Sequence, residues 1–163
     1  MSPKSAPIFC AAVFLTAILC CFGGKECVAA EALQPFAAFN AKVEIDIEDG
    51  EIDMIANFTL NSGSNGLDLV KDVVSLELKG GKSAYSVAIP AGSFKKDSGG
   101  GFNFQGTITR VKLTASVRPS RGGSFDFEVE TEGANLKGFA NPVTVSLAIG
   151  DNHGSRTVTA KIE

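Results

Sequence analysis

The chain has 163 residues and a mass of 16.9 kDa, which suits a single domain. It carries 15 Lys and Arg against 18 Asp and Glu, and this formal charge of −3 argues against a nucleic-acid partner, because phosphate binding needs a clustered basic field. All four cysteines lie within residues 10–27. If a leader containing them is removed, the mature protein has no thiol for a nucleophile, a disulfide or a zinc site.

Residues 1–30 are predicted to form an export signal. Lys4 gives a positive start, residues 8–22 are an unbroken run of apolar or small residues, and residues 28–30 have the small side chains that a signal peptidase requires. We place the cleavage after Ala30. The apolar run is shorter than the roughly 20 residues that span a bilayer, so we expect no transmembrane segment in the mature chain. The protein is therefore expected to be exported, and to be periplasmic or extracellular.

A short segment, residues 31–40, leads into the first predicted hairpin. Apolar and acidic residues alternate strictly up to Ile47 and again from Ile52, and Asp49-Gly50 lies between the two runs. An Asp-Gly pair in this position is typical of a two-residue turn, since both central residues need positive φ. This turn would place Ile47 opposite Ile52, so that the apolar residues of both strands share one face.

Seven more alternating segments follow, separated by glycine- and proline-rich turns; they cover residues 74–78, 85–89, 102–108, 111–117, 125–129, 143–149 and 158–162. The alternation slips at Thr109-Arg110, where we expect a bulge or a tight turn. No stretch has helical periodicity over three turns. About nine short strands indicate an all-β fold, an antiparallel two-sheet β-sandwich that is immunoglobulin-like or jelly-roll-like, occupying residues 41–163 as one domain.

A weak internal repeat relates residues 66–89 to residues 133–162. Each copy contains a Gly-x-x-Leu motif, a gap, an alternating strand, and then a glycine and a further strand. Each half is too small to bury a hydrophobic core, so the repeat indicates two related halves of one sandwich.

The outward face of the first hairpin is strongly acidic, with six carboxylates between residues 44 and 53. The two-residue turn would place Asp46 opposite Asp53 and Glu48 opposite Glu51, with Cβ atoms about 5 Å apart. Like charges at this spacing are unfavourable, and Ca²⁺ binds carboxylate oxygens at similar density, so these four residues are the candidate Ca²⁺ ligands. The alternatives are a solvated face that protects a sheet edge and neutralisation by a neighbouring basic strand.

A second hairpin is predicted to have balanced charges. A loop at residues 119–123 would place Lys112 opposite Glu130 and Arg110 opposite Glu132. Such complementary cross-strand pairs contribute to structure, which makes the unmatched first hairpin the more informative surface.

Few residues suggest catalysis or sugar binding. His153, the only histidine, is assigned to a turn at residues 151–154, whereas a Ser-His-Asp site needs an acid paired with the imidazole. We therefore name no catalytic residue and expect no enzymatic activity. The absence of Trp and the apolar-side position of Tyr85 argue against carbohydrate binding. Phe36 and Phe39 are expected to pack onto the sandwich.

Together these features predict an exported, non-enzymatic β-sandwich that acts by binding or assembly, with the acidic hairpin of residues 42–58 as its working surface. The expected partner is a protein or an envelope component, and the only candidate cofactor is Ca²⁺. Two alternatives remain open. One is a structural subunit of an envelope or surface assembly, and the other is an extracytoplasmic hydrolase.

Overall fold

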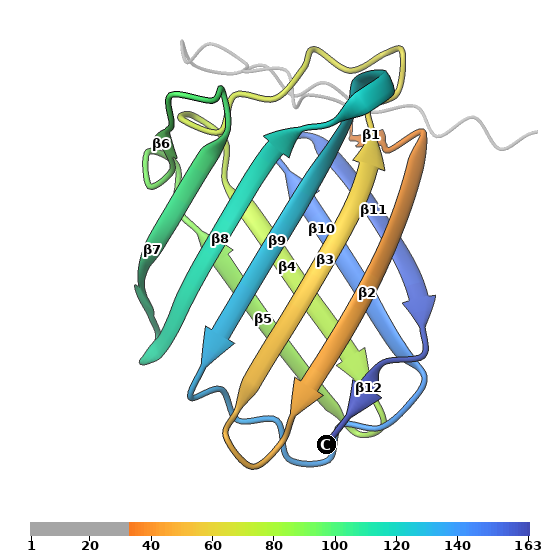
Figure 1. The fold of residues 1–163 in the computed structure, drawn as a ribbon. Coiled ribbons are helices and arrows are strands. Elements are labelled where there is room, and N and C mark those ends of the chain that lie inside the picture. The colour runs from red at the N-terminus through yellow and green to blue at the C-terminus, as the bar shows by residue number, and fades with distance from the viewer. Residues whose placement is uncertain (1–32) are drawn as a thin grey trace, which may run out of the picture. The chain divides into compact units, whose positions relative to one another are not determined.

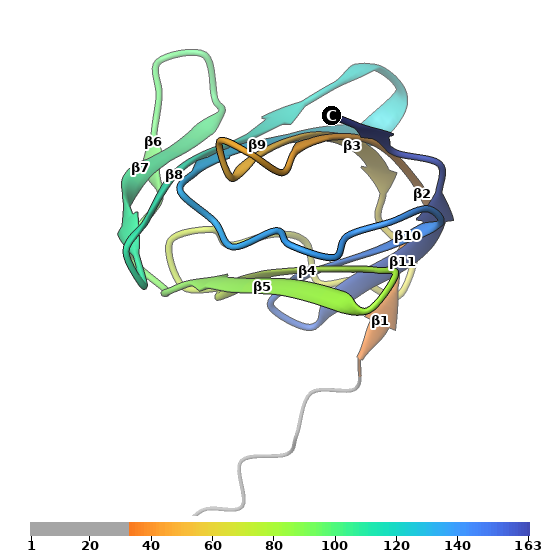
Figure 2. The ribbon, with the colours of Figure 1, turned by 90° about the horizontal axis from the view of Figure 1, so that it is seen from below.

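The computed structural model describes residues 33–163, so the predicted signal peptide and its cleavage site after Ala30 lie outside the described residues. The described chain confirms the predicted fold class, because two mostly antiparallel sheets pack face to face as an open β-sandwich (Figures 1 and 2). Nine of its strands have seven to nine residues and three have only two. In this part of the chain no helix is long and apolar enough to cross a membrane.

The first sheet has five strands, in the order β1 (Gln34–Pro35), β11 (Asn152–Val158), β10 (Val143–Ile149), β4 (Val74–Gly80) and β5 (Ser83–Ile89). The second has seven, in the order β12 (Lys161–Ile162), β2 (Ala38–Asp46), β3 (Glu51–Thr59), β9 (Ser124–Glu132), β8 (Val111–Pro119), β7 (Phe102–Ile108) and β6 (Lys95–Lys96). A 3₁₀ turn, η1 (Arg121–Gly123), joins β8 to β9.

The core lies between the sheets and is formed by the apolar side of each alternating strand. On β3, for example, Ile52 and Phe58 are fully buried whereas Ile55 is 54% exposed. Phe58 stacks on Phe36, with ring centroids 4.4 Å apart, so the predicted packing of the leading segment onto the sandwich is confirmed. Each buried side chain of this size contributes about 1.5–3 kcal/mol to stability, so the inner faces determine the fold.

The register of the first hairpin differs from the prediction. Strand β2 ends at Asp46, the turn takes four residues, 47–50, and Ile45 rather than Ile47 lies opposite Ile52. Two backbone hydrogen bonds to other parts of the chain hold the turn residues outside the pairing of β2 with β3. The Ile47 N–H donates to the Glu163 carbonyl at 3.0 Å, and the Gly50 carbonyl accepts from a neighbouring loop. The shift is two residues, so every side chain keeps its face but changes its partner.

The second hairpin is also shifted by two residues. Lys112 lies opposite Glu132, Thr114 lies opposite Glu130, and Arg110 lies in a turn, so both predicted charge pairs were wrong. The Ser120 N–H donates to the Ser124 carbonyl at 2.8 Å, which centres the loop one residue later than expected.

Two predictions concerned turns. Thr109 and Arg110 form a two-residue turn between β7 and β8, both with positive φ, so the tight turn expected there is confirmed. The turn assigned to residues 151–154 was wrong, because β11 begins at Asn152 and His153 lies within it, opposite Ala148. Gly150, with φ of 59°, supplies the turn one step earlier.

The two segments compared by the repeat prediction contain the hairpins β4–β5 and β10–β11. These hairpins are neighbours in the five-stranded sheet, paired through β4 and β10. A common origin of the two segments stays a prediction.

Candidate functional site

Eight carboxylates lie on the outer side of β2, β3 and β9, which are adjacent in the seven-stranded sheet, and six of them are gathered toward the β2–β3 turn. We call this surface the acidic face, and it consists of Glu44, Asp46, Glu51, Asp53, Glu130 and Glu132. In one row Glu44 lies opposite Asp53, and Asp53 lies opposite Glu130. In the next, Asp46 lies opposite Glu51, with Glu132 at the adjoining end of β9. The arrangement follows from the period of two, which directs every second residue to solvent.

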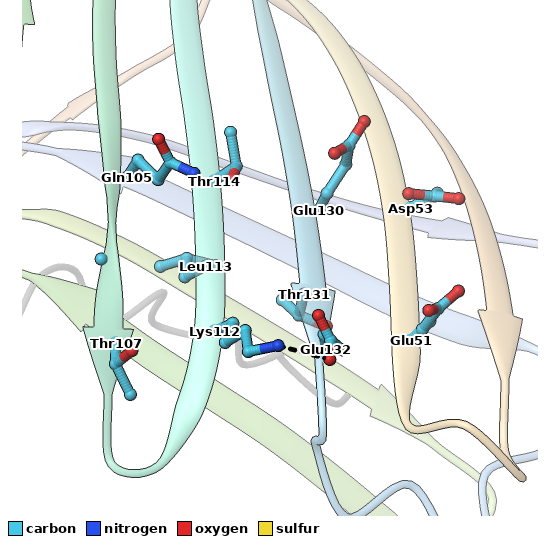
Figure 3. A pocket seen from close by; sticks show the side chains of 11 residues that line it. Glu51, Asp53, Gln105, Thr107, Lys112, Leu113, Thr114, Glu130, Thr131 and Glu132 are labelled. Carbon is cyan, nitrogen blue, oxygen red and sulfur yellow. Dashed lines mark hydrogen bonds and ion pairs between the residues drawn. The ribbon is translucent and has the colours of Figure 1, made fainter.

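Lysines pair with some of these acids. Lys42 Nζ lies 2.7 Å from Glu44 Oε1, and Lys161 Nζ lies 3.8 Å from Glu44 Oε2. Because Lys42 donates a hydrogen bond to it, the Glu44 carboxylate has a pKa below its ordinary value. On the other side, Lys112 Nζ lies 2.7 Å from Glu132 Oε1, the pair joined by a dashed line in Figure 3.

Three acids of this surface have no partner of any kind in the described chain. Among residues 33–163, the side chains of Glu51, Asp53 and Glu130 form no ion pair or hydrogen bond, and all three are exposed. Two of them, Asp53 and Glu130, are directly opposite neighbours on β3 and β9. Like charges in this position destabilise a sheet, so the three acids are not explained by the needs of the fold.

A shallow hollow lies over these unpaired acids. Its wall on β7 and β8 has the polar, uncharged side chains of Gln105, Thr107 and Thr114, together with Lys112 and Leu113. Figure 3 shows these side chains on the β7–β8 side and the carboxylates on the β3–β9 side. The hollow therefore combines negative charge along one wall with hydrogen-bonding groups along the other.

The residues predicted to bind Ca²⁺ are only partly brought together. Asp46 and Glu51 are opposite each other, and Asp53 is on the same face, but Glu48 lies in the turn rather than opposite Glu51. Asp46 Oδ1 accepts the backbone N–H of Glu48 at 2.9 Å, so this carboxylate already helps to form the turn. Among residues 33–163, no three acidic, histidine or cysteine side chains are gathered as a metal ion requires. Calcium binding stays a prediction for experiment.

The outer face of the five-stranded sheet has a different composition. Small residues from adjacent strands lie opposite one another, as Ser146 does with Ser155 and Ser75 with Ala148. Its charged pair, Glu77 and Lys79, is self-neutralising at 2.9 Å. His153 also lies here, and its Nδ1 is buried without a hydrogen-bond partner among the described residues. No carboxylate pairs with the imidazole in this part of the chain, so the geometry lacks the acid of a catalytic triad.

The sequence did not identify Glu130 and Glu132 as parts of the acidic face. Their alternation with Val129 and Thr131 shows that they point outward, but only the strand order places β9 beside β3. Comparisons with protein-family models, curated proteins and solved structures found no match to this chain.

Proposed function

We propose that the protein is an exported binding module whose acidic face docks onto a basic surface of a partner protein. The observation that carries this proposal is the set of three exposed acids, Glu51, Asp53 and Glu130, that are left without a cation at matched positions on adjacent strands. Opposed carboxylates are unfavourable in the free protein, so a lysine- or arginine-bearing partner relieves repulsion as well as adding attraction.

The shape and polarity of the surface support a protein partner. The hollow beside the acids is open and shallow, and Gln105, Thr107 and Thr114 offer both donors and acceptors to a bound polypeptide. Electrostatic complementarity of this kind increases the association rate and selects the orientation of the complex. The proposed activity is therefore binding, with specificity contributed by the charges of β3 and β9.

The test is calorimetric titration of the purified protein with an oligolysine peptide as the probe. We expect binding that weakens as salt is raised, and that the double variant Asp53→Asn/Glu130→Gln weakens by about tenfold or more. The matched control is Glu77→Gln/Asp151→Asn, which removes the same charge from β4 and from the turn between β10 and β11. Equal loss in both double variants would show only a response to net charge and would contradict the proposal.

A second experiment, with Ca²⁺, distinguishes binding of a partner protein from binding of a cation at the acidic face. Thermal unfolding is measured in EDTA and in millimolar Ca²⁺ for the parent protein and for Asp46→Asn/Asp53→Asn. A ligand that binds only the native state raises the midpoint of unfolding. A Ca²⁺-dependent rise in the parent alone would mean that the acidic face is a cation site, and the basic-partner proposal would then be wrong.

A further inference from the structure

The four edges of the two sheets differ in how they are protected against pairing with another strand. Three of them end in two-residue strands, which are β1, β12 and β6. These short strands contain residues that discourage strand addition, namely Pro35, Lys161 and the pair Lys95–Lys96. Short length, proline and lysine are the features by which natural sheets avoid edge-to-edge association.

The fourth edge, β5, has none of these features. Its seven residues, Ser83–Ile89, include no charged residue and no proline, and β4 is its single neighbour within the described chain. The other flank of the same sheet is different, because β11 is partly covered by β1. Strand β7 also extends past β6, but by only the five residues 104–108, and one of these is Gly106, which weakens a strand interior. Strand β5 is therefore the longest regular unprotected edge in residues 33–163.

The backbone of β5 is oriented for pairing. Gly80 and Ser83 close the two-residue turn between β4 and β5, and successive pairs along an antiparallel hairpin alternate between bonded and non-bonded. By this alternation Ala84, Ser86 and Ala88 direct their N–H and C=O groups away from β4. All three are exposed small residues, so nothing on their side chains blocks an approaching strand.

We propose that β5 pairs antiparallel with β5 of a second copy of this chain, which joins the two five-stranded sheets into one. A two-fold axis at Ser86 places Ala84 opposite Ala88 of the second copy, and Tyr85 opposite Val87. The strand is complementary to itself in this register, because apolar residues meet on the inner side and small residues on the outer side. With no charge on β5, no like charges meet across the axis, and about six backbone hydrogen bonds form.

The proposal requires a closed dimer. Pairing through one edge about a two-fold axis uses that edge in both copies, so association stops at two chains. The dimer is independent of the acidic face, which lies on the other sheet, so its failure would leave the binding proposal intact.

Analytical ultracentrifugation of the purified protein tests the pairing. We expect a monomer–dimer equilibrium whose dissociation constant rises by about tenfold or more in Ser86→Lys and in Ser86→Pro. The Ser86 N–H points away from β4, so proline removes no hydrogen bond of the folded monomer. The control Thr157→Lys adds the same charge on the outer side of β11 and leaves the dimer unchanged.

A crosslink tests the register. With the four cysteines of residues 10–27 replaced by serine, Ser86→Cys places the two new cysteines opposite each other across the axis, at a separation that a disulfide spans, and oxidation gives a covalent dimer. Thr157→Cys does not crosslink. A monomer at every concentration, open-ended association, or a dimer unaffected by both Ser86→Lys and Ser86→Pro would overturn the proposal. A monomer that binds the strand of a different protein at β5 would also overturn it.

Discussion

The two outer faces of this sandwich have opposite chemistry although they cover the same core. On β2, β3 and β9 the outward residues are mostly carboxylates, and three of them form neither an ion pair nor a hydrogen bond in the described chain. On β4, β10 and β11 they are mostly Ser, Ala and Thr, with one self-neutralising charged pair. The inner faces are alike in being apolar, since both present buried aliphatic side chains to the core. The fold therefore requires the inner pattern, and the outer faces are free to serve binding and assembly.

The largest expected effect is a difference in stability between a buried and an exposed position on the same strand, β3. Ile52→Ala should destabilise the protein by about 2–5 kcal/mol, because it leaves a cavity at a fully buried position. Ile55→Ala, the same substitution three residues along β3 at a position 54% exposed, should change stability by less than about 0.5 kcal/mol. Chemical denaturation of both variants measures the difference, and equal losses would contradict the assignment of the two faces.

A second prediction concerns the missing cation of the acidic face. Thr114 is exposed and lies opposite Glu130, so Thr114→Lys should supply the partner that Glu130 lacks and stabilise the protein by about 0.2–1 kcal/mol. Thr157→Lys on the five-stranded sheet, where the opposite residue is Thr144, should give no such gain. Thermal melts at low salt compare the two. A gain in both variants, or a loss in Thr114→Lys, would show that the acids are not frustrated in the free protein.

The next prediction uses a carboxylate away from the acidic face. The pKa of Asp97 lies below its ordinary value of 3.8, because the Asn103 side chain and the backbone N–H groups of Gly101 and Gly99 donate hydrogen bonds to it. A lowered folded-state pKa contributes stability that is present above pH 3.8 and is lost as the pH falls through the folded value. The difference in melting temperature between the parent and Asp97→Asn should therefore shrink below pH 3.8. A difference in melting temperature that does not change with pH would show that the ionised Asp97 carboxylate does not contribute this stability.

The smallest expected effect is at Tyr85. Its hydroxyl is buried without a hydrogen-bond partner among the described residues, and burial raises its pKa. An unsatisfied buried hydroxyl is a cost to the folded state, so Tyr85→Phe should leave stability unchanged or raise it by about 1 kcal/mol or less. A clear loss of stability in chemical denaturation would mean that the hydroxyl has a partner.

The sequence predicted the sandwich because the period of two is strict on both sides of most turns. Strand faces followed from that period alone, and they survived the two-residue shifts in both hairpins. Cross-strand partners did not follow, since they depend on contacts from distant residues, such as the bond between the Ile47 N–H and the Glu163 carbonyl. His153 was misplaced for a related reason, because Asn and Gly in residues 152–154 are typical of turns but here form a strand beside Pro35.

Only the part of the candidate site on β2 and β3 could be predicted from the sequence. Local alternation showed that the acids of β2 and β3 share a face, because the hairpin connects these strands directly. The acids of β9 join the site through sheet order, which local patterns do not specify. The correction matters for function. Glu130 was expected to be neutralised by Lys112, and instead it extends the unpaired acidic surface.

The most direct test of the acidic face is a titration of isotope-labelled protein with the oligolysine peptide, followed by amide chemical shifts in NMR spectra. The account predicts shifts that cluster on β2, β3 and β9, with the largest changes near Asp53 and Glu130, and none on β4, β10 or β11. Shifts centred on the five-stranded sheet, or spread evenly over both sheets, would contradict it.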